Sequence, residues 1–279
     1  MSGLPGTGEW IWEWRAAPGG GRLKLWAPAA APQWIETGWA YWCDPPRDRE
    51  TVRSHNWGGR VERVCLGPAG ASCYIKRFSP IHPRHLYKVP RARHTVLHES
   101  RIRQLGFHVP ETVCLIERYR YGIAVESLVI SLEVSGIRKV STLINEEAGD
   151  APEAWAAKRN LLRQVAGEVG RWHNAGLFHG DLHAGNLVYR PETDPPWFCW
   201  IDNEEGRHYR RLPWARRVHD LNHLNRQRHR LSRTDRLRWW ESYLEVTKLT
   251  GQEQQRVRRA VARKTRAFWR KKGWMYNDK

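Results

Sequence analysis

The sequence has 279 residues, of which 41% are hydrophobic and 11% aromatic, enough for a packed core in one large domain or in two lobes and too apolar for wholesale disorder. Its 47 Lys and Arg residues against 29 Asp and Glu give a formal charge of +18, which favours a polyanionic partner: nucleic acid, an anionic membrane surface or a phosphorylated substrate. The five cysteines are scattered without a CxxC pair, which argues against a disulfide framework or a zinc site and for a reducing compartment. No secretory signal and no run of about 20 apolar residues is visible, so we expect a soluble or peripherally attached protein.

Residues 1–37 are interpreted as a leader rich in Trp, Gly and Pro, and eight of the 17 tryptophans fall within the first 60 residues. We expect this leader to be loosely ordered, with one short strand. Trp10, Trp12 and Trp14 alternate along it, which would place their indoles on one face of a strand. Such a face suits a partner or a membrane interface, although a single tryptophan is more often part of a core.

Residues 38–136 are predicted to form a small lobe built on an antiparallel sheet. The turn Gly67-Pro68-Ala69-Gly70 between two apolar segments indicates a hairpin. Leu97, Arg101 and Leu105 follow helical spacing, and Gly106 is a natural stop after them. The expected elements are strand-like segments within 38–78, a helix over 92–105, and strands at 112–118 and 125–134.

Residues 137–279 are predicted to form a larger, mainly helical lobe. A long helix is expected over 152–175, because Pro152 marks its start, Gly176 its end, and its apolar residues form one continuous face. A hairpin should follow, with strands at 187–189 and 197–201, and the chain from about 215 is expected to be helical and basic. The fold class is therefore α+β: a bilobal fold with a small antiparallel-sheet N-lobe carrying one helix and a larger, mainly helical C-lobe, and the segment described next makes this a protein-kinase-like fold.

The segment at 179–186, His-Gly-Asp-Leu-His-Ala-Gly-Asn, is typical of a kinase catalytic loop. Phosphoryl transfer needs a carboxylate that orients the acceptor hydroxyl and takes its proton, a role that suits Asp181. Mg²⁺ prefers hard oxygen ligands together with phosphates, and Asn186 with Asp202 at the end of the next hairpin would supply two. The sequence thus predicts ATP and Mg²⁺ as cofactors.

Two further residues complete the predicted site. Lys76 ends an apolar strand and would neutralise the α- and β-phosphates of ATP, while Glu99 on the following helix would orient Lys76 by an ion pair. Taken alone, a lysine at a strand end or an acidic residue on a helix is usually solvated. The order and spacing of the whole series carry the prediction.

The loop that covers the phosphates is predicted at residues 54–60, with Gly58 and Gly59 contacting the nucleotide. The sequence holds no GxGxxG motif, so this assignment depends on position alone. The competing turn at 67–70 lies too close to Lys76 and fits the next hairpin better.

Three neighbouring polar residues are expected to serve the architecture. His179 should pack beneath Asp202 and steady the loop, and Asp220 should tie its helix to the catalytic loop through backbone amides. His183 is ambiguous, since it would touch phosphate or acceptor, or be solvated like most loop histidines.

With these residues in place, the chain resembles the Kdo/WaaP family of lipopolysaccharide kinases over roughly residues 50–272. The motifs that carry the resemblance are Tyr74-Ile75-Lys76-Arg77, the run from Glu99 to Gly106, His173-Asn174-Ala175-Gly176 before His179-Gly180-Asp181, Ile201-Asp202, and Asp220-Leu221-Asn222-His223-Leu224. The resemblance implies a kinase fold and phosphorylation of an inner-core sugar, a heptose or Kdo. It also implies Asp181 as catalytic aspartate, Asn186 and Asp202 as metal ligands, and Lys76 as the ATP-phosphate lysine.

The sequence departs from protein kinases at two places. Gly180 replaces the Arg of the H-R-D loop, and Asp202-Asn203-Glu204 replaces D-F-G, so regulation by activation-loop phosphorylation is doubtful. The catalytic segment also resembles aminoglycoside and choline phosphotransferases, which leaves a small-molecule phosphotransferase or an atypical protein kinase as alternatives.

The dense basic run between Arg256 and Lys272 is read as a face that meets anionic glycolipid or the anionic inner leaflet of a membrane, against the simpler reading of a solvated helix face. We therefore expect a cytoplasmic enzyme, peripheral on the inner membrane. Nucleic acid is not expected as a partner, because no helix-turn-helix or zinc signal accompanies the charge; a nucleic-acid-binding protein with a vestigial kinase segment is the remaining alternative.

Overall fold

The computed structural model describes residues 9–54, 60–67, 70–79, 89–146, 152–190, 193, 196–226 and 231–273. The chain divides into two compact units. Unit 1 comprises Met1–Gln104 and Val109–Ser135, and unit 2 comprises Leu105–His108 and Gly136–Lys279. No helix among the described residues has the length and apolar character needed to cross a membrane.

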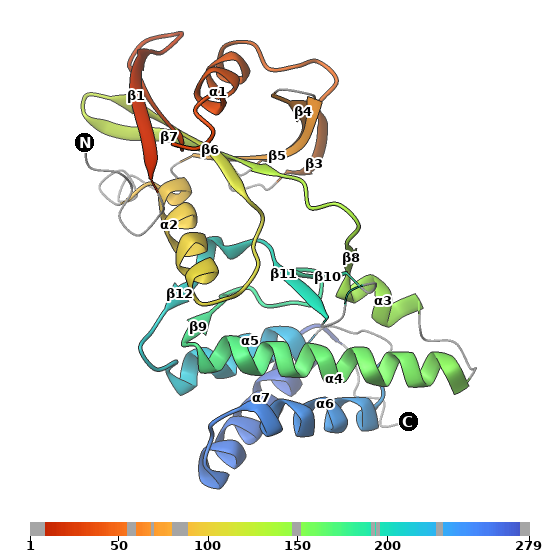
Figure 1. Ribbon diagram of the computed structural model, residues 1–279. Helices are drawn as coiled ribbons and strands as arrows, with labels where there is room; N and C mark the ends of the chain where they lie inside the picture. Colours follow the sequence, from red (N-terminus) through yellow and green to blue (C-terminus); the bar gives the residue numbers. More distant parts are fainter. Residues whose placement is uncertain are drawn as a thin grey trace. The chain divides into compact units, whose positions relative to one another are not determined.

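Unit 1 is built on a seven-stranded sheet whose strands are paired antiparallel in the order β1-β2-β6-β7-β5-β4-β3 (Figure 1). The strands are β1 (Trp10–Ala16), β2 (Arg22–Pro28), β3 (Glu50–Ser54), β4 (Arg60–Leu66), β5 (Ala71–Phe78), β6 (Thr112–Arg120) and β7 (Ile123–Leu132).

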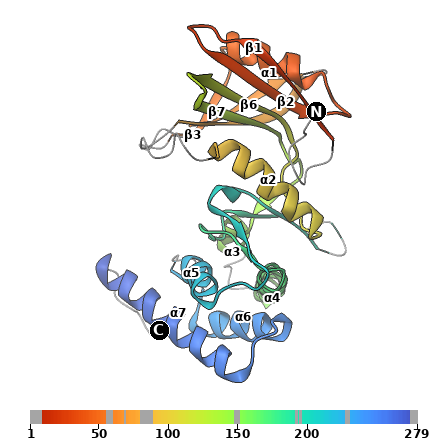
Figure 2. The ribbon, with the colours of Figure 1, turned by 90° about the vertical axis from the view of Figure 1, so that its left-hand side faces the viewer.

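Two helices cover opposite faces of this sheet (Figure 2). Residues alternate between faces along a strand, so Cys114 and Ile116 on β6 join the buried cluster of helix α1 (Trp34–Cys43). Leu115 between them instead joins the cluster that contains Ala92 and Val96 of helix α2 (Arg91–Gln104). The near-continuous apolar character of β6 follows from burial on both sides.

The amino-terminal part of unit 1 differs from the sequence prediction. The expected loosely ordered leader holds two strands, β1 and β2, and β2 pairs with β6. The chain expected to turn strand-like from about residue 38 is helical until Cys43, so the predicted start of the lobe at residue 38 falls inside α1. The leader prediction was wrong because the pairing of β2 with a strand some 90 residues later leaves no local signal. The helix was missed because its Trp, Tyr and Ile residues are typical of strands.

The tryptophans of β1 alternate as predicted, but a lysine occupies the surface they make. The Lys24 ammonium on β2 lies 4.0 Å from the centre of the Trp12 ring and 4.1 Å from that of Trp26. Trp10 and Trp12 also pack against the α2-side cluster. Trp10 and Trp12 therefore contribute to the core of unit 1 and Trp12 to a cation–π contact within it, whereas Trp14 stays exposed.

Unit 2 is mainly helical, as predicted. Its helices are α3 (Val140–Glu146), α4 (Pro152–Asn174), α5 (Trp214–Asn225), α6 (Arg233–Val246) and α7 (Gly251–Lys271), and its short strands are β8 (Arg138–Lys139), β9 (Leu177–Phe178), β10 (Leu187–Arg190), β11 (Trp197–Trp200) and β12 (Arg207–His208). The predicted hairpin is β10–β11, paired from Leu187 opposite Trp200. Helix α4 packs against α6 and α5 against α7, an arrangement visible in Figure 1.

Helix α4 is the longest helix of unit 2 among the described residues, and its sequence shows why it forms. Leu161, Val165, Val169 and Trp172 are all buried, at the spacing that places them along one side of a helix. The helix ends before Gly176, whose φ of +77° and close approach to the Tyr209 carbonyl leave no room for a side chain. The chain then enters β9 and the predicted catalytic loop.

Candidate active site

The loop between β9 and β10 is held by one buried carboxylate. Asp220 on α5 is fully buried; its Oδ2 accepts a hydrogen bond from the His179 amide at 2.9 Å and its Oδ1 one from the Gly180 amide at 3.0 Å. Burial alone would raise the pKa of Asp220, but hydrogen bonding from His173 and His219 outweighs it and holds this pKa well below its usual range. The predicted architectural role of Asp220 is confirmed by these contacts.

His179 steadies the same loop from within the core. Its Nε2 lies 3.1 Å from the Ile201 carbonyl and its Nδ1 3.3 Å from the Asp181 amide. Since the carbonyl can only accept and the amide can only donate, His179 carries its proton on Nε2. The ring packs beside Trp172 and Trp200, which stack with centroids 3.9 Å apart. Both ring nitrogens of His179 thus contact backbone groups of the loop and its surroundings, which is the structural role that was predicted.

Gly180, which stands where protein kinases carry Arg, occupies a position that excludes a side chain. Its φ is +89°, and a Cβ there would lie 2.7 Å from Cβ of Glu205. A side chain would therefore meet both backbone strain and a steric clash. The departure from the protein-kinase pattern has a local physical cause.

Asp181, the predicted base, is presented at the surface of this loop with two histidines around it. Its Oδ1 lies 3.2 Å from Nδ1 of His223 and its Oδ2 lies 4.0 Å from Nε2 of His183. The hydrogen bond with His223, opposed in part by burial and helped by the nearby histidines, lowers the pKa of Asp181 to about 2. The carboxylate is therefore ionised throughout the neutral range.

Asn186 and Asp202, the predicted metal ligands, lie at the open end of the β10–β11 hairpin. Asn186 precedes β10 and Asp202 follows β11, and the Ile201 amide donates to the Asn186 carbonyl at 3.0 Å. Asp202 adopts a left-handed conformation with φ of 66°, a strained choice for a non-glycine residue that is common at functional sites.

These two residues fit Mg²⁺ by their chemistry. The side-chain nitrogen of Asn186 donates to the Asp181 carbonyl at 3.0 Å, so its amide oxygen is the atom that remains for a ligand. With the Asp202 carboxylate this gives two hard oxygen donors, the number that Mg²⁺ commonly takes from protein when phosphates supply the rest. Within the described ranges no group of three or more His, Cys, Asp and Glu side chains forms a metal cluster.

The predicted nucleotide-binding pair lies in unit 1. Lys76 is on β5, half-buried, with its ammonium 5.9 Å from the centre of the Phe78 ring. Glu99 is buried on α2, where its Oε2 accepts a hydrogen bond from Thr112 at 3.1 Å. The expected ion pair between Lys76 and Glu99 stays a prediction, and Gly58 and Gly59 lie outside the described residues.

Two residues of the site were missed by the sequence reasoning. His223 contacts Asp181, and Arg226 Nη2 lies 2.8 Å from Nδ1 of His223. His223 follows Asp220 by three residues, so both side chains leave the same face of α5. Once Asp220 is assigned to the catalytic loop, that helical spacing is the signal that brings His223 to the same loop.

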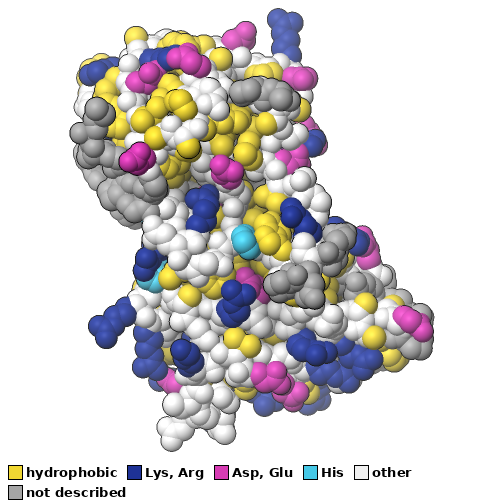
Figure 3. All heavy atoms as spheres, in the orientation of Figure 1, with side chains coloured by type: hydrophobic (Ala, Val, Ile, Leu, Met, Phe, Trp, Pro, Cys, Tyr) yellow, Lys and Arg dark blue, Asp and Glu magenta, His cyan; other side chains and the backbone are white. Residues whose placement is uncertain are grey.

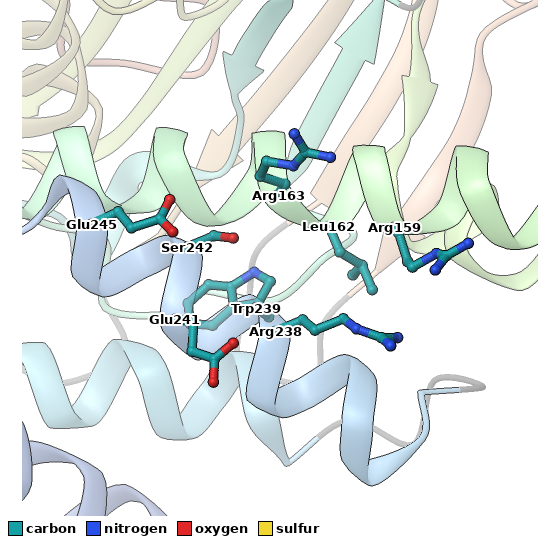
Figure 4. A pocket seen from close by; sticks show the side chains of 8 residues that line it. All are labelled: Arg159, Leu162, Arg163, Arg238, Trp239, Glu241, Ser242 and Glu245. Atoms are coloured by element: carbon teal, nitrogen blue, oxygen red, sulfur yellow. The ribbon is translucent and has the colours of Figure 1, made fainter.

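A separate groove of about 200 Å³ lies between α4 and α6, and none of the predicted site residues lines it (Figure 4). Leu162 points from α4 toward α6, where Trp239 lies. The remaining lining side chains are of mixed charge: Arg159, Arg163, Arg238, Glu241, Ser242 and Glu245. The groove is therefore a consequence of helix packing rather than an alternative to the Asp181 site.

Comparison with known proteins agrees with this assignment of the fold. The model of the lipopolysaccharide kinase (Kdo/WaaP) family matches residues 73–243. A solved structure described as WaaP in complex with acyl carrier protein is similar with a TM-score of 0.60 and 20% identity, covering 78% of this chain and 88% of that one. The predicted kinase-like α+β fold is confirmed.

A curated relative gives a weaker match. The EKC/KEOPS complex subunit BUD32 of Gibberella zeae is 28% identical over 145 residues. The aligned part covers 49% of this chain and 52% of that protein, so the chain spans about half the length of this relative.

Proposed function

The chain belongs to the lipopolysaccharide kinase (Kdo/WaaP) family, and we propose that it transfers the γ-phosphate of ATP to a hydroxyl group of a lipopolysaccharide inner-core sugar, a heptose or Kdo. As a member of this family it is an ATP-dependent kinase that acts on a hydroxyl. The sugar and the residues that phosphorylate it are the proposal.

The observation that carries the proposal is the loop that presents Asp181. Asp220 fixes the backbone before Asp181, and the Asn186 side chain holds the Asp181 carbonyl. Asp181 therefore projects from a backbone restrained on both sides, beside the hairpin end that carries Asp202. A restrained carboxylate next to a pair of oxygen ligands is what phosphoryl transfer to a hydroxyl requires, because catalysis there is mainly positioning and charge stabilisation.

Asp181 is the acceptor-side group in this proposal. With its pKa lowered to about 2, it is a weak base that accepts a hydrogen bond from the acceptor hydroxyl and orients it. It would take the proton late, as bonding to the phosphorus becomes advanced. This suits a transition state in which the leaving bond is largely broken before the new one forms.

The remaining predicted residues serve the nucleotide. Asn186 and Asp202 would hold Mg²⁺, which neutralises charge on the phosphates. Lys76, oriented by Glu99, would pair with the α- and β-phosphates, and backbone amides of the segment that includes Gly58 and Gly59 would cover them.

The test is phosphate transfer from labelled ATP to purified inner-core oligosaccharide. We expect Asp181→Asn to lower kcat by about 10²- to 10⁴-fold, the usual contribution of a positioned acid–base group, and Asp202→Asn to raise the Mg²⁺ concentration needed for half-maximal rate. Glu241→Gln, an exposed change on α6, is the control and should match wild type. Equal incorporation by wild type and Asp181→Asn would refute the assignment.

The same assay separates the alternative acceptors. Aminoglycosides and choline are cationic, and enzymes that bind them need acidic surroundings, whereas Lys and Arg side chains gather over unit 2 on the face drawn in Figure 3. A higher kcat/KM for these compounds, or for a protein substrate, than for core oligosaccharide would favour the small-molecule or protein kinase reading.

We also propose that α7 contacts the anionic inner leaflet of the membrane. Its buried side includes Val257, Val261 and Trp269, while its exposed side carries a basic series. The exposed basic residues are Arg256, Arg258, Arg259, Arg263, Lys264, Arg266, Arg270 and Lys271. This localisation, cytoplasmic and peripheral, is supported by that charge.

Cosedimentation with vesicles tests the membrane proposal. At about 1 kcal/mol per basic residue near an anionic surface, Arg259→Gln with Arg266→Gln should weaken binding to phosphatidylserine-containing vesicles by about 30-fold. Arg47→Gln with Arg101→Gln removes equal charge from unit 1 and should leave binding unchanged. Equal loss in both double variants would mean that net charge, not the α7 surface, drives binding.

A further inference from the structure

The carboxyl end of α5 brings a histidine and an arginine beside Asp181. His223 is mostly buried, with its side chain 15% exposed, and its Nδ1 lies 3.2 Å from Asp181 Oδ1. Arg226, the residue that caps the helix, has Nη2 2.8 Å from the same Nδ1. One ring nitrogen thus faces a carboxylate on one side and a guanidinium on the other.

That nitrogen can satisfy only one of its two neighbours. When Nδ1 carries a proton it donates to Asp181 and has no lone pair for Arg226; when it does not, it accepts from Arg226 and faces Asp181 with a lone pair. Because the Asp181 oxygen at 3.2 Å is a carboxylate oxygen, which accepts hydrogen bonds, the first state is the favourable one. His223 is then committed to Asp181, and the Arg226 N–H is left facing another N–H.

Arg226 is also held firmly in place. Nε1 of Trp269 donates to the Arg226 carbonyl at 2.8 Å, and the guanidinium lies 4.8 Å from the centre of the Phe268 ring. Both aromatic residues are on α7, which is tied to α5 again through Asn225 and Thr265 at 3.2 Å. Within the described part of the chain, the polar atom that approaches this guanidinium is Nδ1 of His223, at 2.8 Å.

The partly buried position of the Arg226 guanidinium is energetically unfavourable unless a further group binds it. Burial lowers the pKa of Arg226, and the charge of Asp181 offsets part of that effect. Arginine nevertheless stays charged in proteins. The Arg226 guanidinium is thus a partly desolvated cation with an unsatisfied N–H donor, and only the His223 ring separates it from the Asp181 carboxylate. An anion is the ligand that would complete this arrangement, since a guanidinium binds carboxylate or phosphate through paired hydrogen bonds.

We propose that Arg226 binds an anionic group of the acceptor next to the hydroxyl that Asp181 orients, and that His223, by holding Asp181, leaves Arg226 to the substrate. The inference rests on the proposed role of Asp181. It makes Arg226 a specificity residue: it selects acceptors that carry a carboxylate or a phosphate near the reacting hydroxyl. His223 is a positioning residue.

Calorimetric binding of acceptors in the absence of ATP tests the inference without requiring turnover. The acceptors are a Kdo-containing oligosaccharide, the same compound with its carboxylates reduced to alcohols, and a phosphorylated heptose. We expect Arg226→Gln to weaken binding of at least one anionic acceptor by about 10- to 100-fold, the scale of a hydrogen-bonded charge pair, and to leave the reduced compound unchanged. The anionic acceptor that responds identifies the source of the charge, and Arg226→Lys should restore part of the affinity.

Arg216→Gln is the matched control, because Arg216 is on the same helix and stacks on Phe178 at 5.0 Å without touching the site. It should bind every acceptor as wild type does, and circular dichroism of Arg226→Gln should be unchanged. Steady-state kinetics add a second readout, in which Arg226→Gln raises KM for the anionic acceptor and leaves KM for ATP and the kcat within about threefold.

Three outcomes separate the two proposals. Binding that depends on Arg226 without any phosphate transfer would sink the proposed function and keep the anion site. Normal transfer with an unchanged acceptor KM in Arg226→Gln would overturn the anion site and keep the function. A rise in KM for ATP alone would also overturn it, since Arg226 would then serve the nucleotide.

Discussion

Asp220 is the residue whose replacement tests most directly how the catalytic loop is held. In Asp220→Asn one side-chain oxygen remains and accepts one backbone N–H, while the new NH₂ group faces the other. The variant therefore loses one charge-assisted hydrogen bond, weakens a second, and leaves a buried donor of the 179–180 backbone unsatisfied. Hydrogen bonds to charged groups contribute about 1.5–3 kcal/mol each and an unsatisfied buried group costs about 1–3 kcal/mol, so we expect a loss of about 3–5 kcal/mol.

Thermal unfolding measures the effect of Asp220→Asn on the stability of unit 2, and hydrogen exchange measures its effect on the 179–180 backbone. For a domain of 150–250 residues each kcal/mol lowers Tm by about 2–4 °C, so the transition of unit 2 should move down by roughly 6–20 °C. Peptides that contain the His179 and Gly180 amides should lose protection in hydrogen-exchange mass spectrometry. A change below about 1 kcal/mol with protection intact would refute the reasoning that these two bonds hold the loop.

The pH dependence of the same variant has a defined sign. The pKa of Asp220 is lower in the folded protein than its usual value near 3.9, so its stabilising contribution is present above about pH 4 and is lost as the pH falls further. The difference in unfolding free energy between wild type and Asp220→Asn should therefore be constant from pH 5 to neutrality and shrink in more acidic buffers.

Three further changes probe other supports of the fold. Gly180→Ala should lower the unfolding free energy by about 2–4 kcal/mol and the kcat with it, because an L residue at φ of +89° is strained and its Cβ meets Glu205. Arg93→Met should cost about 3–5 kcal/mol in chemical denaturation, since it leaves Glu117, which is fully buried, without the guanidinium that binds it. Thr250→Ala should cost about 0.5–2 kcal/mol, because Thr250 accepts the hydrogen bond that caps α7.

Each of these has a control that isolates its cause. Gly122→Ala has the same kind of backbone strain, with φ of +75°, but no atom near the added Cβ, so an equal loss there would assign the Gly180 effect to strain alone. Arg101→Met removes an exposed arginine of α2, and Thr234→Ala removes an exposed threonine from the first turn of α6. If either control lost as much stability as its partner, the buried pair or the cap would not be the cause.

The parts of unit 2 that could be predicted from the sequence are those whose signals are local. The spacing of Leu161, Val165, Val169 and Trp172 predicts α4, because burial of one stripe on a helix determines the pattern directly. The β10–β11 hairpin is likewise a short-range structure. The order of Asp181, Asn186 and Asp202 along this segment was enough to predict that one loop and one hairpin carry them.

The amino-terminal strands show where such reasoning ends. The alternation of Trp10, Trp12 and Trp14 predicts a strand correctly, but nothing within the leader indicates that β2 pairs with β6. The side chain that covers the indoles, Lys24, is one that a sequence pattern assigns to solvent. Cation–π contacts with Trp12 and Trp26 replace part of its hydration, and that exchange depends on cross-strand neighbours rather than on sequence spacing.

The basic residues of helix α7 do not describe the whole role of the helix. They are evident in the sequence, and they favour an anionic surface as partner. Its opposite side, however, holds the residues that fix the end of α5: Trp269 binds the Arg226 carbonyl and Thr265 binds Asn225. Since Arg226 and His223 lie at that end, any surface that binds α7 would act on a helix already coupled to Asp181. A membrane contact of α7, if it forms as proposed, would therefore act on the same packed pair of helices, α5 and α7, that holds the groups proposed to face the acceptor. Substitution of Trp269 by Leu should accordingly raise the acceptor KM even where vesicle binding is preserved, which a purely electrostatic role for α7 does not predict.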